Sequence, residues 1–396
     1  MEADFEGVAL VCGVEVPYRR QAPEHSTGDL LAQAFDAALA QSGFSAREVD
    51  GLGVASFTLA PDHAIDMAWR LGLSPRWCMD DCHGGASAIN LLQHAIRAIQ
   101  HGDASVIVLL SGDRFEAADF RQLVEHYNLT TRTYLLPLEN GGPNSLFAML
   151  TQRHARKHGL DARDYGALCV AQRAWAALNP GAVYRTPLTL DDYLNAPRVA
   201  DPLGRFDCVP VVCGANAVVV ARADLAARRA QAGAPTPLRV RALQCRYNTD
   251  HQAADGLQTG LAALADTLWQ QANATPADID VISVYDDYPV MSLIQLADLG
   301  FAPDGDLRAL IARIASRELA VNTSGGQLSA GQAGAAGGMH GLVETIRQLQ
   351  GLAGARQVAG ARQVAGARLA LASGYGMVQY RYGMCANAVV LDKENA

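Results

Sequence analysis

The chain has 396 residues; half of them are hydrophobic, 18% are charged, and the formal net charge is −8. This length is enough for two domains or one large duplicated domain with a substantial core. The negative charge argues against nucleic acid as a main partner. No apolar run has the length of a membrane span, and residues 1–20 lack the basic start and apolar centre of a signal peptide. We therefore expect a globular, cytoplasmic protein.

The eight cysteines are scattered along the chain, which is typical of reduced thiols in the cytosol rather than of a disulfide framework. Cys78 and Cys82 lie close together, but no second Cys/His pair at zinc spacing lies near them. We expect no metal site.

An internal duplication is visible in the order of the predicted elements. Residues 30–57 predict a helix, a short turn and a buried strand, and residues 260–287 repeat this pattern with a similar turn. Alternation of helices with apolar strands is typical of a mostly parallel sheet covered by helices.

A second match follows in each half. Gly84 and Gly85 precede a helix that ends at Gln100 and a strand at 104–111, and Gly334 precedes a helix that ends at Gln350 and a strand at 367–373. We expect two α/β halves related by a pseudo-twofold axis, at residues 1–235 and 236–396. Residues 114–205 fit neither repeat and are interpreted as an inserted lid.

Cys82 directly precedes small residues that begin an apolar helix. A thiol at a helix N-terminus is favoured as thiolate by the macrodipole, and the Gly84-Gly85 pair lets a substrate approach backbone N–H groups. This pattern suits a covalent acyl-thioester intermediate, although a buried structural cysteine is the alternative. In the repeat, Cys82 corresponds to Gln332, so a site shared by the two helix starts is expected.

Asp286 and Asp287 follow the apolar strand predicted at 279–284. We expect one of them to cap the helix that begins at Pro289. A direct catalytic role for either carboxylate is the alternative.

Four motifs in order show a resemblance to a known family: Cys82 to Gly85, Val284 to Tyr288, Asn322 to Gly331 and Ser373 to Met377. With them the chain resembles the thiolase superfamily, in particular its sterol-carrier or lipid-transfer type, over essentially its whole length. The resemblance implies the thiolase fold, an α/β fold with two pseudo-twofold-related halves in five α-β-α-β-α layers and an inserted lid.

The resemblance also implies roles for single residues. Cys82 is the nucleophile, while Gln332 and Tyr285 stand where thiolases have their two histidines, and the second cysteine of thiolases is absent near Ala372. Glutamine cannot accept and return a proton, so a base is needed from elsewhere, and His83 is a candidate.

Further roles complete the predicted site. The backbone of Gly376 is expected to donate to an oxyanion, Asn322 to orient a water molecule or Tyr285, and Tyr375 to shape the acyl pocket. Ser329 and Asp286 are further candidates for substrate contacts.

Three activities stay open. The first choice is thiolase-like cleavage or formation of a C–C bond through a Cys82 thioester, on an unusual aromatic or branched β-ketoacyl-CoA, as benzoylsuccinyl-CoA thiolase does. The second is a retro-aldolase in which Tyr285 takes the β-hydroxyl proton of a β-hydroxyacyl-CoA, and the third is a non-catalytic acyl-CoA-binding subunit.

The resemblance further implies the ligands and partner proteins of this chain. Coenzyme A is expected as part of the substrate and product, and no other cofactor is expected. A homodimer and a small partner protein with an OB-fold and a zinc ribbon are the expected assembly.

Overall fold

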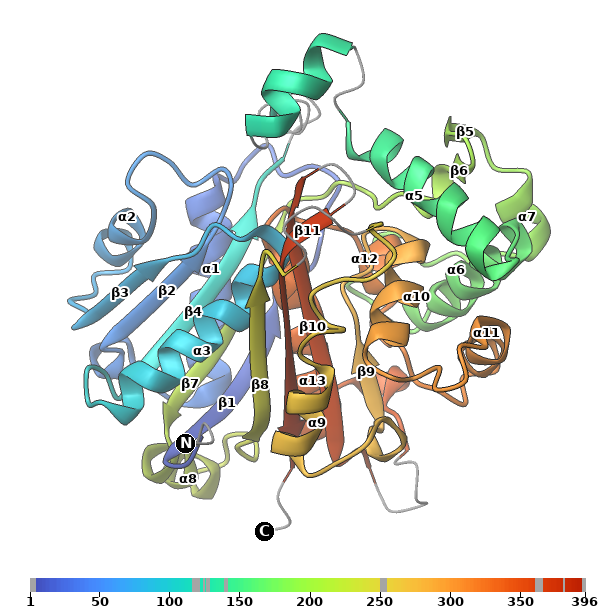
Figure 1. Cartoon of the computed structure of the whole chain (residues 1–396). Coiled ribbons are helices and arrows are strands. Elements are labelled where there is room, and N and C mark those ends of the chain that lie inside the picture. The colour runs from blue at the N-terminus through green and yellow to red at the C-terminus, as the bar shows by residue number, and fades with distance from the viewer. Residues whose placement is uncertain are drawn as a thin grey trace.

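The computed structural model describes residues 5–115, 122–123, 125, 129–138, 142–249, 255–359, 366–379 and 382–393. Its first half forms a five-stranded sheet in the order β1-β7-β4-β2-β3 (Figure 1). The strands are β1 (Val8–Glu15), β2 (Gly51–Ala55), β3 (Trp77–Asp80), β4 (Val106–Asp113) and β7 (Gly214–Arg222).

The second half forms a four-stranded sheet in the order β8-β11-β10-β9. Its strands are β8 (Arg239–Tyr247), β9 (Val281–Ser283), β10 (Leu369–Gln379) and β11 (Tyr382–Asp392). The two orders correspond strand by strand when β8, β11, β10 and β9 are matched with β1, β7, β4 and β2. The duplication inferred from the sequence is therefore present in the topology.

The expectation of mostly parallel sheets is wrong. Among the described strands of the two sheets, β2·β3, β2·β4 and β9·β10 are parallel, whereas β1·β7, β4·β7, β8·β11 and β10·β11 are antiparallel. The reason is that each sheet has one returning strand, β7 or β11, beside the parallel pair. Periodicity of apolar residues cannot distinguish such a strand from a parallel one.

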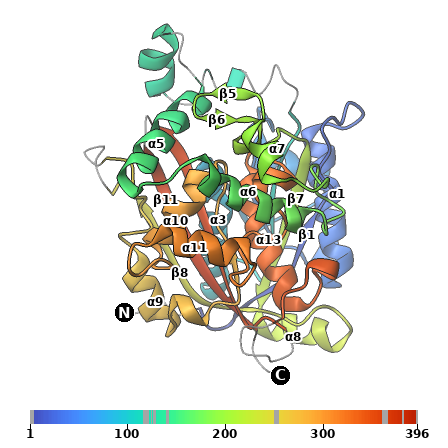
Figure 2. The same ribbon diagram turned by 90° about the vertical axis from the view of Figure 1, so that its right-hand side faces the viewer.

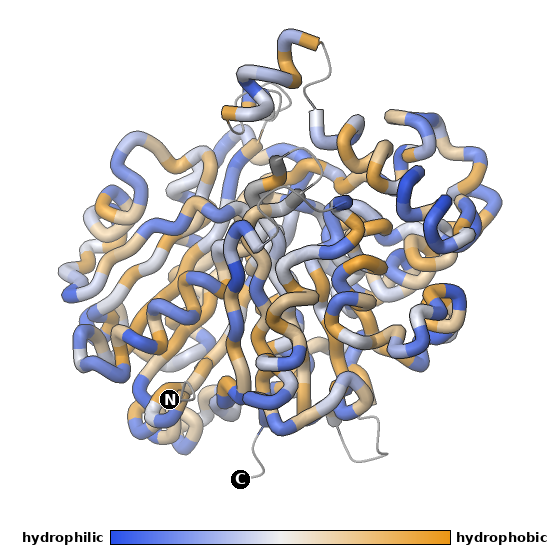
Figure 3. The backbone as a smooth tube through the Cα atoms, in the orientation of Figure 1, coloured by the Kyte–Doolittle hydropathy of each residue, from blue (hydrophilic) through white to orange (hydrophobic). Residues whose placement is uncertain are grey.

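Two helices, α3 (Ser87–Gln100) and α13 (Ala336–Gln350), lie between the sheets. Ile96 of α3 and Ile346 of α13 belong to one hydrophobic cluster that also holds Leu109 of the first sheet and Val389 of the second. The strands and central helices carry the hydrophobic residues of the interior (Figure 3).

Outer helices complete the layers. The helix α1 (Thr27–Ser42) covers the other face of the first sheet. The helices α10 (Pro289–Asp298) and α11 (Leu307–Ala315) lie in front of β10 and β11 in Figure 2, with α9 (Ala265–Ala272) packed beside them. The five-layered α-β-α-β-α arrangement of the thiolase fold is confirmed.

The segment interpreted as an insertion packs at one side of the second sheet. Its described elements are α5 (Pro143–His158), α6 (Ala162–Ala176), α7 (Leu190–Leu194), β5 (Arg198–Ala200) and β6 (Leu203–Gly204). Residues 129–138 project from the body of the molecule (Figure 1) and expose Leu129, Tyr134 and Leu138.

Three more helices are α2 (His63–Arg70), α8 (Ala223–Gln231) and the short α12 (Gly326–Ala330). The expected junction near residue 235 falls between α8 and β8, where the chain passes from the first sheet to the second. Within the described ranges, no helix is both long and apolar enough to cross a membrane.

Local signals explain where α1 begins and ends. Ser26 and Asp29 form a capping box, in which the Asp29 N–H donates to Ser26 Oγ at 3.1 Å and the Ser26 N–H donates to the Asp29 carboxylate at 2.7 Å. Gly43, at φ 73°, ends the helix in the left-handed conformation.

A close approach joins α13 to the turn before α3. A Cβ atom built on Gly338 would lie 2.2 Å from the carbonyl oxygen of Gly85. Only glycine allows this contact, so the two central helices meet at their N-terminal ends through backbone rather than through side chains.

We predict that Gly338→Ala destabilises the fold although alanine favours a helix by about 1 kcal/mol over glycine. The clash with Gly85 outweighs this gain, and a net loss of about 1–3 kcal/mol is expected for such overpacking. The control is Gly204→Ala, where the nearest atoms to a new Cβ are 3.7 Å away. Urea unfolding measures both, and equal stability of the two variants would contradict the close approach.

Candidate active site

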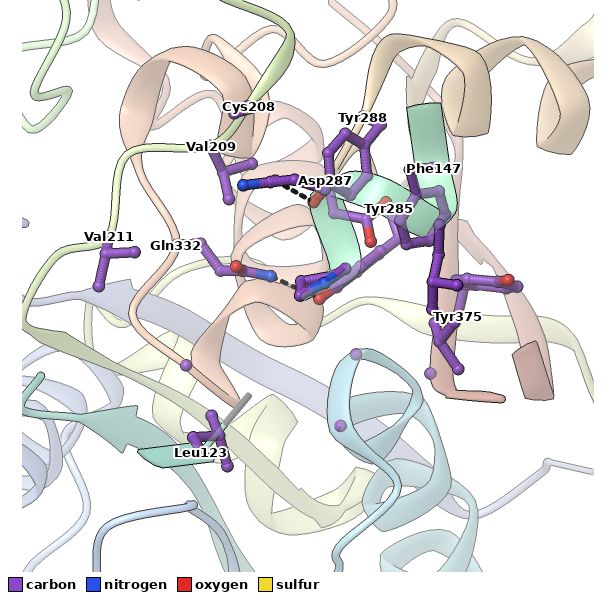
Figure 4. Close-up of a pocket in the computed structure, with 18 of the residues that line it drawn as sticks. Leu123, Phe147, Cys208, Val209, Val211, Tyr285, Asp287, Tyr288, Gln332 and Tyr375 are labelled. Atoms are coloured by element: carbon purple, nitrogen blue, oxygen red, sulfur yellow. Dashed lines mark hydrogen bonds between the residues drawn. The ribbon is translucent and has the colours of Figure 1, made fainter. Parts of the chain in front are cut away.

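A cavity of about 310 Å³ opens where the starts of α3 and α13 meet the end of β9 and the inserted segment. Aromatic and aliphatic side chains form most of its wall, among them Phe57, Phe115, Phe147, Val209 and Val211 (Figure 4). Its described lining contains no Lys, Arg or His side chain.

Tyr285 and Gln332 form the polar centre of this cavity. The Gln332 amide Nε2 donates a hydrogen bond to the Tyr285 hydroxyl at 2.7 Å (Figure 4). The backbone of Gln332 is fixed by Pro210 and Val212: its N–H donates to the Pro210 carbonyl at 3.0 Å, and its carbonyl accepts from the Val212 N–H at 3.2 Å. The resemblance implied that both residues belong to one site, and in the structure they are joined by this hydrogen bond.

The Tyr285 ring lies directly on the backbone of Gly85. A Cβ atom on Gly85 would be 2.2 Å from the ring. The peptide that carries Tyr285 is held by two buried amides, because Gln295 Nε2 donates to the Tyr285 carbonyl at 2.5 Å and Asn322 Oδ1 accepts from the Val284 N–H at 2.9 Å. Hydrogen bonds therefore hold the backbone at Tyr285, and its ring packs against the Gly85 backbone.

Asn322 lies behind this wall rather than in it. The described lining of the cavity does not include Asn322, whose contact with Tyr285 is through the neighbouring backbone. Its φ of 50° is the left-handed conformation, which asparagine tolerates better than most residues.

The two neighbouring carboxylates point in different directions. Asp286 accepts from the backbone N–H groups of Gln327 at 2.9 Å and Leu328 at 3.4 Å, and from the Gln172 amide at 3.0 Å. It thus caps α12, and burial raises the pKa of this carboxyl to about 6. Asp286 does not line the cavity.

The expectation that Asp286 or Asp287 caps α10 is wrong. The N-cap residue of α10 is Tyr288, without a side-chain cap. Pro289 at the first helical position has no N–H to satisfy, which removes one of the donors that a cap would serve.

Asp287 faces the cavity. Its Oδ1 is buried and has no hydrogen-bond partner among the residues that the structure describes. Burial, and then the neighbouring Asp286 charge, raise the pKa of this carboxyl well above its usual range, against the opposing effect of backbone N–H groups. Beside it, the Tyr288 hydroxyl donates to Asn144 Oδ1 at 2.6 Å, and its ring stacks on Phe147 with centroids 4.2 Å apart.

Cys82 and His83 lie outside the described lining of the cavity. Cys82 is exposed on the loop between β3 and the short turn Gly84–Ala86. His83 Nδ1 lies 3.0 Å from the Asp81 carboxylate, and this hydrogen bond raises the pKa of the imidazole. Neither residue is thus among the described residues that line the cavity with Tyr285 and Gln332.

Of the remaining predicted site residues, some line the cavity and others do not. Tyr375 and Gly376 of β10 line the cavity, next to Gly85. Ser329 of α12 does not line the cavity: its hydroxyl accepts a hydrogen bond from Arg173 Nε at 3.0 Å. No cluster of His, Cys, Asp or Glu suited to a metal ion occurs in the described part of the chain.

The polar lining residues that were not singled out from the sequence are Thr131, Asn144, Cys208 and Tyr288, whereas Asp287 was left open there as an alternative catalytic carboxylate. The pair of carboxylates at a strand end was a signal for Asp287, but it could not show which of the two faces the cavity. Asn144 gave no signal beyond its place in a polar loop.

Comparison with known proteins shows the family of the chain. The family description "Thiolase C-terminal domain-like" matches residues 242–386. A 17-hydroxy-3-oxo-4-pregnene-20-carboxyl-CoA lyase of Mycobacterium tuberculosis is 33% identical over 366 residues, 88% of this chain and 92% of the relative. A steroid side-chain-cleaving aldolase of Thermomonospora curvata is 29% identical over 364 residues, covering 87% and 91%.

Among solved structures, the "Ltp2-ChsH2(DUF35) aldolase" superposes with a TM-score of 0.80 and 24% identity, covering 98% of each chain. The fold and these relatives define the class of the protein. The chain belongs to the thiolase superfamily, among its sterol-carrier-like members.

We predict a pH-dependent effect of Asp287→Asn on stability. A carboxyl whose pKa is higher in the folded than in the unfolded state contributes stability at low pH, and this contribution is lost as pH rises through the folded pKa. Each unit of this difference corresponds to about 1.4 kcal/mol. The variant should therefore gain stability relative to wild type as the pH rises above the usual range of a carboxyl pKa, measured by thermal unfolding, and a difference that is constant with pH would contradict the burial of the charge.

Proposed function

We propose that this protein is a retro-aldolase that cleaves the Cα–Cβ bond of a β-hydroxyacyl-CoA. The observation that carries this proposal is the Gln332–Tyr285 hydrogen bond in an apolar cavity that Cys82 does not line. The two curated relatives described above are named as a lyase and an aldolase, which supports this function over thiolysis.

In this reaction the β-hydroxyl group loses its proton and becomes a ketone, and the electron pair of the broken bond forms the enolate of the thioester. Tyr285 contacts the substrate hydroxyl group. Its phenol oxygen takes the hydroxyl proton while the phenol gives its own proton to another acceptor. The Gln332 amide donates to the phenol oxygen and stabilises negative charge that develops there. Because a carboxamide is neither an acid nor a base near neutral pH, Gln332 acts by orienting the phenol and stabilising its charge.

The enolate oxygen needs hydrogen-bond donors. Gly376 and Gly85 border the cavity, and the absence of side chains lets an acyl group approach their backbone. In our proposal the N–H of Gly376 is one of these donors. Tyr375 shapes the acyl end of the cavity, and the thioester carries coenzyme A.

The proposed substrate has a bulky hydrophobic acyl group, of the steroid side-chain kind. The mainly apolar wall supports this class, since such a group gains free energy by leaving water. The names of the two curated relatives point to the same class.

We also propose that the chain works in the cytoplasm as a homodimer with a small partner protein that has an OB-fold and a zinc ribbon. The name of the structural neighbour, which joins two components, supports a partner. Co-purification of the chain with a co-expressed protein of this type tests the assembly.

Thiolysis of a β-ketoacyl-CoA through a Cys82 thioester is the second candidate function. The retained cysteine at the turn before α3 favours it. In this case Cys82 would have to reach a substrate from outside the cavity.

We predict that Tyr285→Phe lowers kcat for retro-aldol cleavage by about 10²–10⁴-fold, because the substitution removes the proton-transferring hydroxyl group and leaves the ring in place. Cys82→Ala is the control, and its kcat should stay within about twofold of wild type since no covalent bond to the thiol is needed. Product formation from a steroid-type β-hydroxyacyl-CoA measures both variants. Loss of activity in Cys82→Ala with activity retained in Tyr285→Phe would support the thiolase instead.

We predict that Gln332→Leu lowers kcat by about 10–100-fold, the cost of losing one hydrogen bond to a charged group. The same substitution in a Tyr285→Phe background should have little further effect, because the two residues act as a pair. Steady-state kinetics of the four proteins tests the coupling. Additive losses in the double variant would show that Gln332 acts independently of the phenol.

A further inference from the structure

Retro-aldol cleavage requires two proton transfers, and the Tyr285–Gln332 pair accounts for neither the final acceptor of the hydroxyl proton nor the donor to the α-carbon. Phenols pass protons on rather than store them near neutral pH. A group that both accepts and returns a proton is therefore needed within the cavity.

The described lining offers few titratable groups for this role. They are Cys208, Tyr285, Asp287, Tyr288 and Tyr375. Burial raises the pKa of the Cys208 thiol to about 12, and it raises the pKa of Tyr288 well above that of an ordinary tyrosine. Asp287 is the single carboxyl of this described lining.

The geometry of Asp287 suits proton exchange with a bound molecule. Its side chain and that of Tyr285 line the same cavity (Figure 4). Oδ1 is buried without a partner among the described residues, although a buried carboxyl oxygen ordinarily has one. The neighbouring Asp286 carboxylate, in contrast, is fully engaged at the start of α12.

We propose that Asp287 is a catalytic acid–base residue that accepts the proton released by the substrate hydroxyl group and returns it to the α-carbon of the acyl-CoA product. This assignment rests on the proposed retro-aldol function for its first step. Its second step, proton exchange at the α-carbon of an acyl-CoA, is independent of that function.

The proton balance closes within the site. The hydroxyl O–H bond breaks and its proton goes to the Tyr285 oxygen as the phenol proton moves to the Asp287 carboxylate. The Cα–Cβ electron pair becomes the enolate, and this pair then forms a C–H bond with the proton of the Asp287 carboxylic acid. The carboxylate is regenerated, and no oxidant, reductant or external proton is consumed.

The surroundings of Asp287 favour its action as a base. Tyr285, Tyr288 and Cys208 share the cavity lining with Asp287, and the Asp286 carboxyl adjoins it in the chain. The pKa values of Tyr288 and Cys208 are raised, so both groups are neutral at moderate pH. A carboxylate in a site without a cation is poorly stabilised and takes up a proton more readily than one in water. Removal of a hydroxyl proton benefits from this higher basicity.

The test is hydrogen exchange at the α-carbon of a saturated acyl-CoA in D2O, followed by mass spectrometry of the thioester. The full chain is used, together with its partner protein where one co-purifies, and propionyl-CoA and a long branched acyl-CoA are the probes. Wild-type protein should exchange the α-protons, and Asp287→Asn should do so at least about 100-fold more slowly. Binding of the acyl-CoA should be unchanged in this variant.

A matched control is Asp298→Asn. Asp298 is a half-buried carboxyl at the other end of α10, where it accepts from the N–H and hydroxyl of Thr259, and desolvation raises its pKa to about 7. It lies outside the described lining of the cavity, so this variant should exchange at the wild-type rate. A second variant, Asp287→Ala, should regain exchange when formate is added, because a small carboxylate can occupy the space of the missing side chain.

The outcomes separate the two proposals. Exchange by Asp287→Asn within threefold of wild type, or no exchange by the wild-type protein, would overturn the role of Asp287. Asp287-dependent exchange without cleavage of any β-hydroxyacyl-CoA would support Asp287 and reject the retro-aldolase. Cleavage at the wild-type rate by Asp287→Asn would leave the retro-aldolase standing and remove Asp287 from it.

Discussion

The site depends on the close contacts around the backbone of Gly85. A Cβ atom on this residue would lie 2.2 Å from the Tyr285 ring and 2.3 Å from the Tyr375 carbonyl oxygen, and one on Gly338 would lie 2.2 Å from the Gly85 carbonyl. The two halves of the molecule therefore approach each other at a point where there is room for no side chain. The Tyr285 ring occupies the space that a side chain on Gly85 would fill, and the cavity opens beside it.

This arrangement determines which chemistry the cavity supports. Its described wall has no cation, and the groups that it offers to the negative charge of an enolate are dipoles: amide groups such as Gln332 and backbone N–H groups. Fixed dipoles in an apolar cavity act strongly because little solvent screens them. The same conditions make an isolated carboxylate costly, which is why Asp286 and Asp287 differ so much although they are adjacent. Asp286 is compensated by the start of α12, and Asp287 is left to exchange its proton.

The sequence predicts the architecture well because the duplication leaves its pattern in residue types. Two helix starts marked by glycine, two similar turns and four motifs in order gave the thiolase fold and the positions of Tyr285 and Gln332. Strand direction was not predictable, since β7 and β11 are apolar like the parallel strands beside them. The direction of side chains at strand and helix ends was also not predictable from the sequence. A change of one residue decides whether a carboxylate such as Asp286 caps α12 or faces a cavity, and no periodicity extends over so short a segment.

In the proposed retro-aldol reaction no covalent bond to Cys82 forms. The most direct measurement is the intact mass of wild-type protein, sampled on the millisecond to second timescale during turnover of a steroid-type β-hydroxyacyl-CoA, with any partner present. We expect a ketone and a shortened acyl-CoA as products, while the protein keeps its unmodified mass throughout. An acyl adduct on Cys82 that forms and decays at the rate of turnover would contradict this proposal.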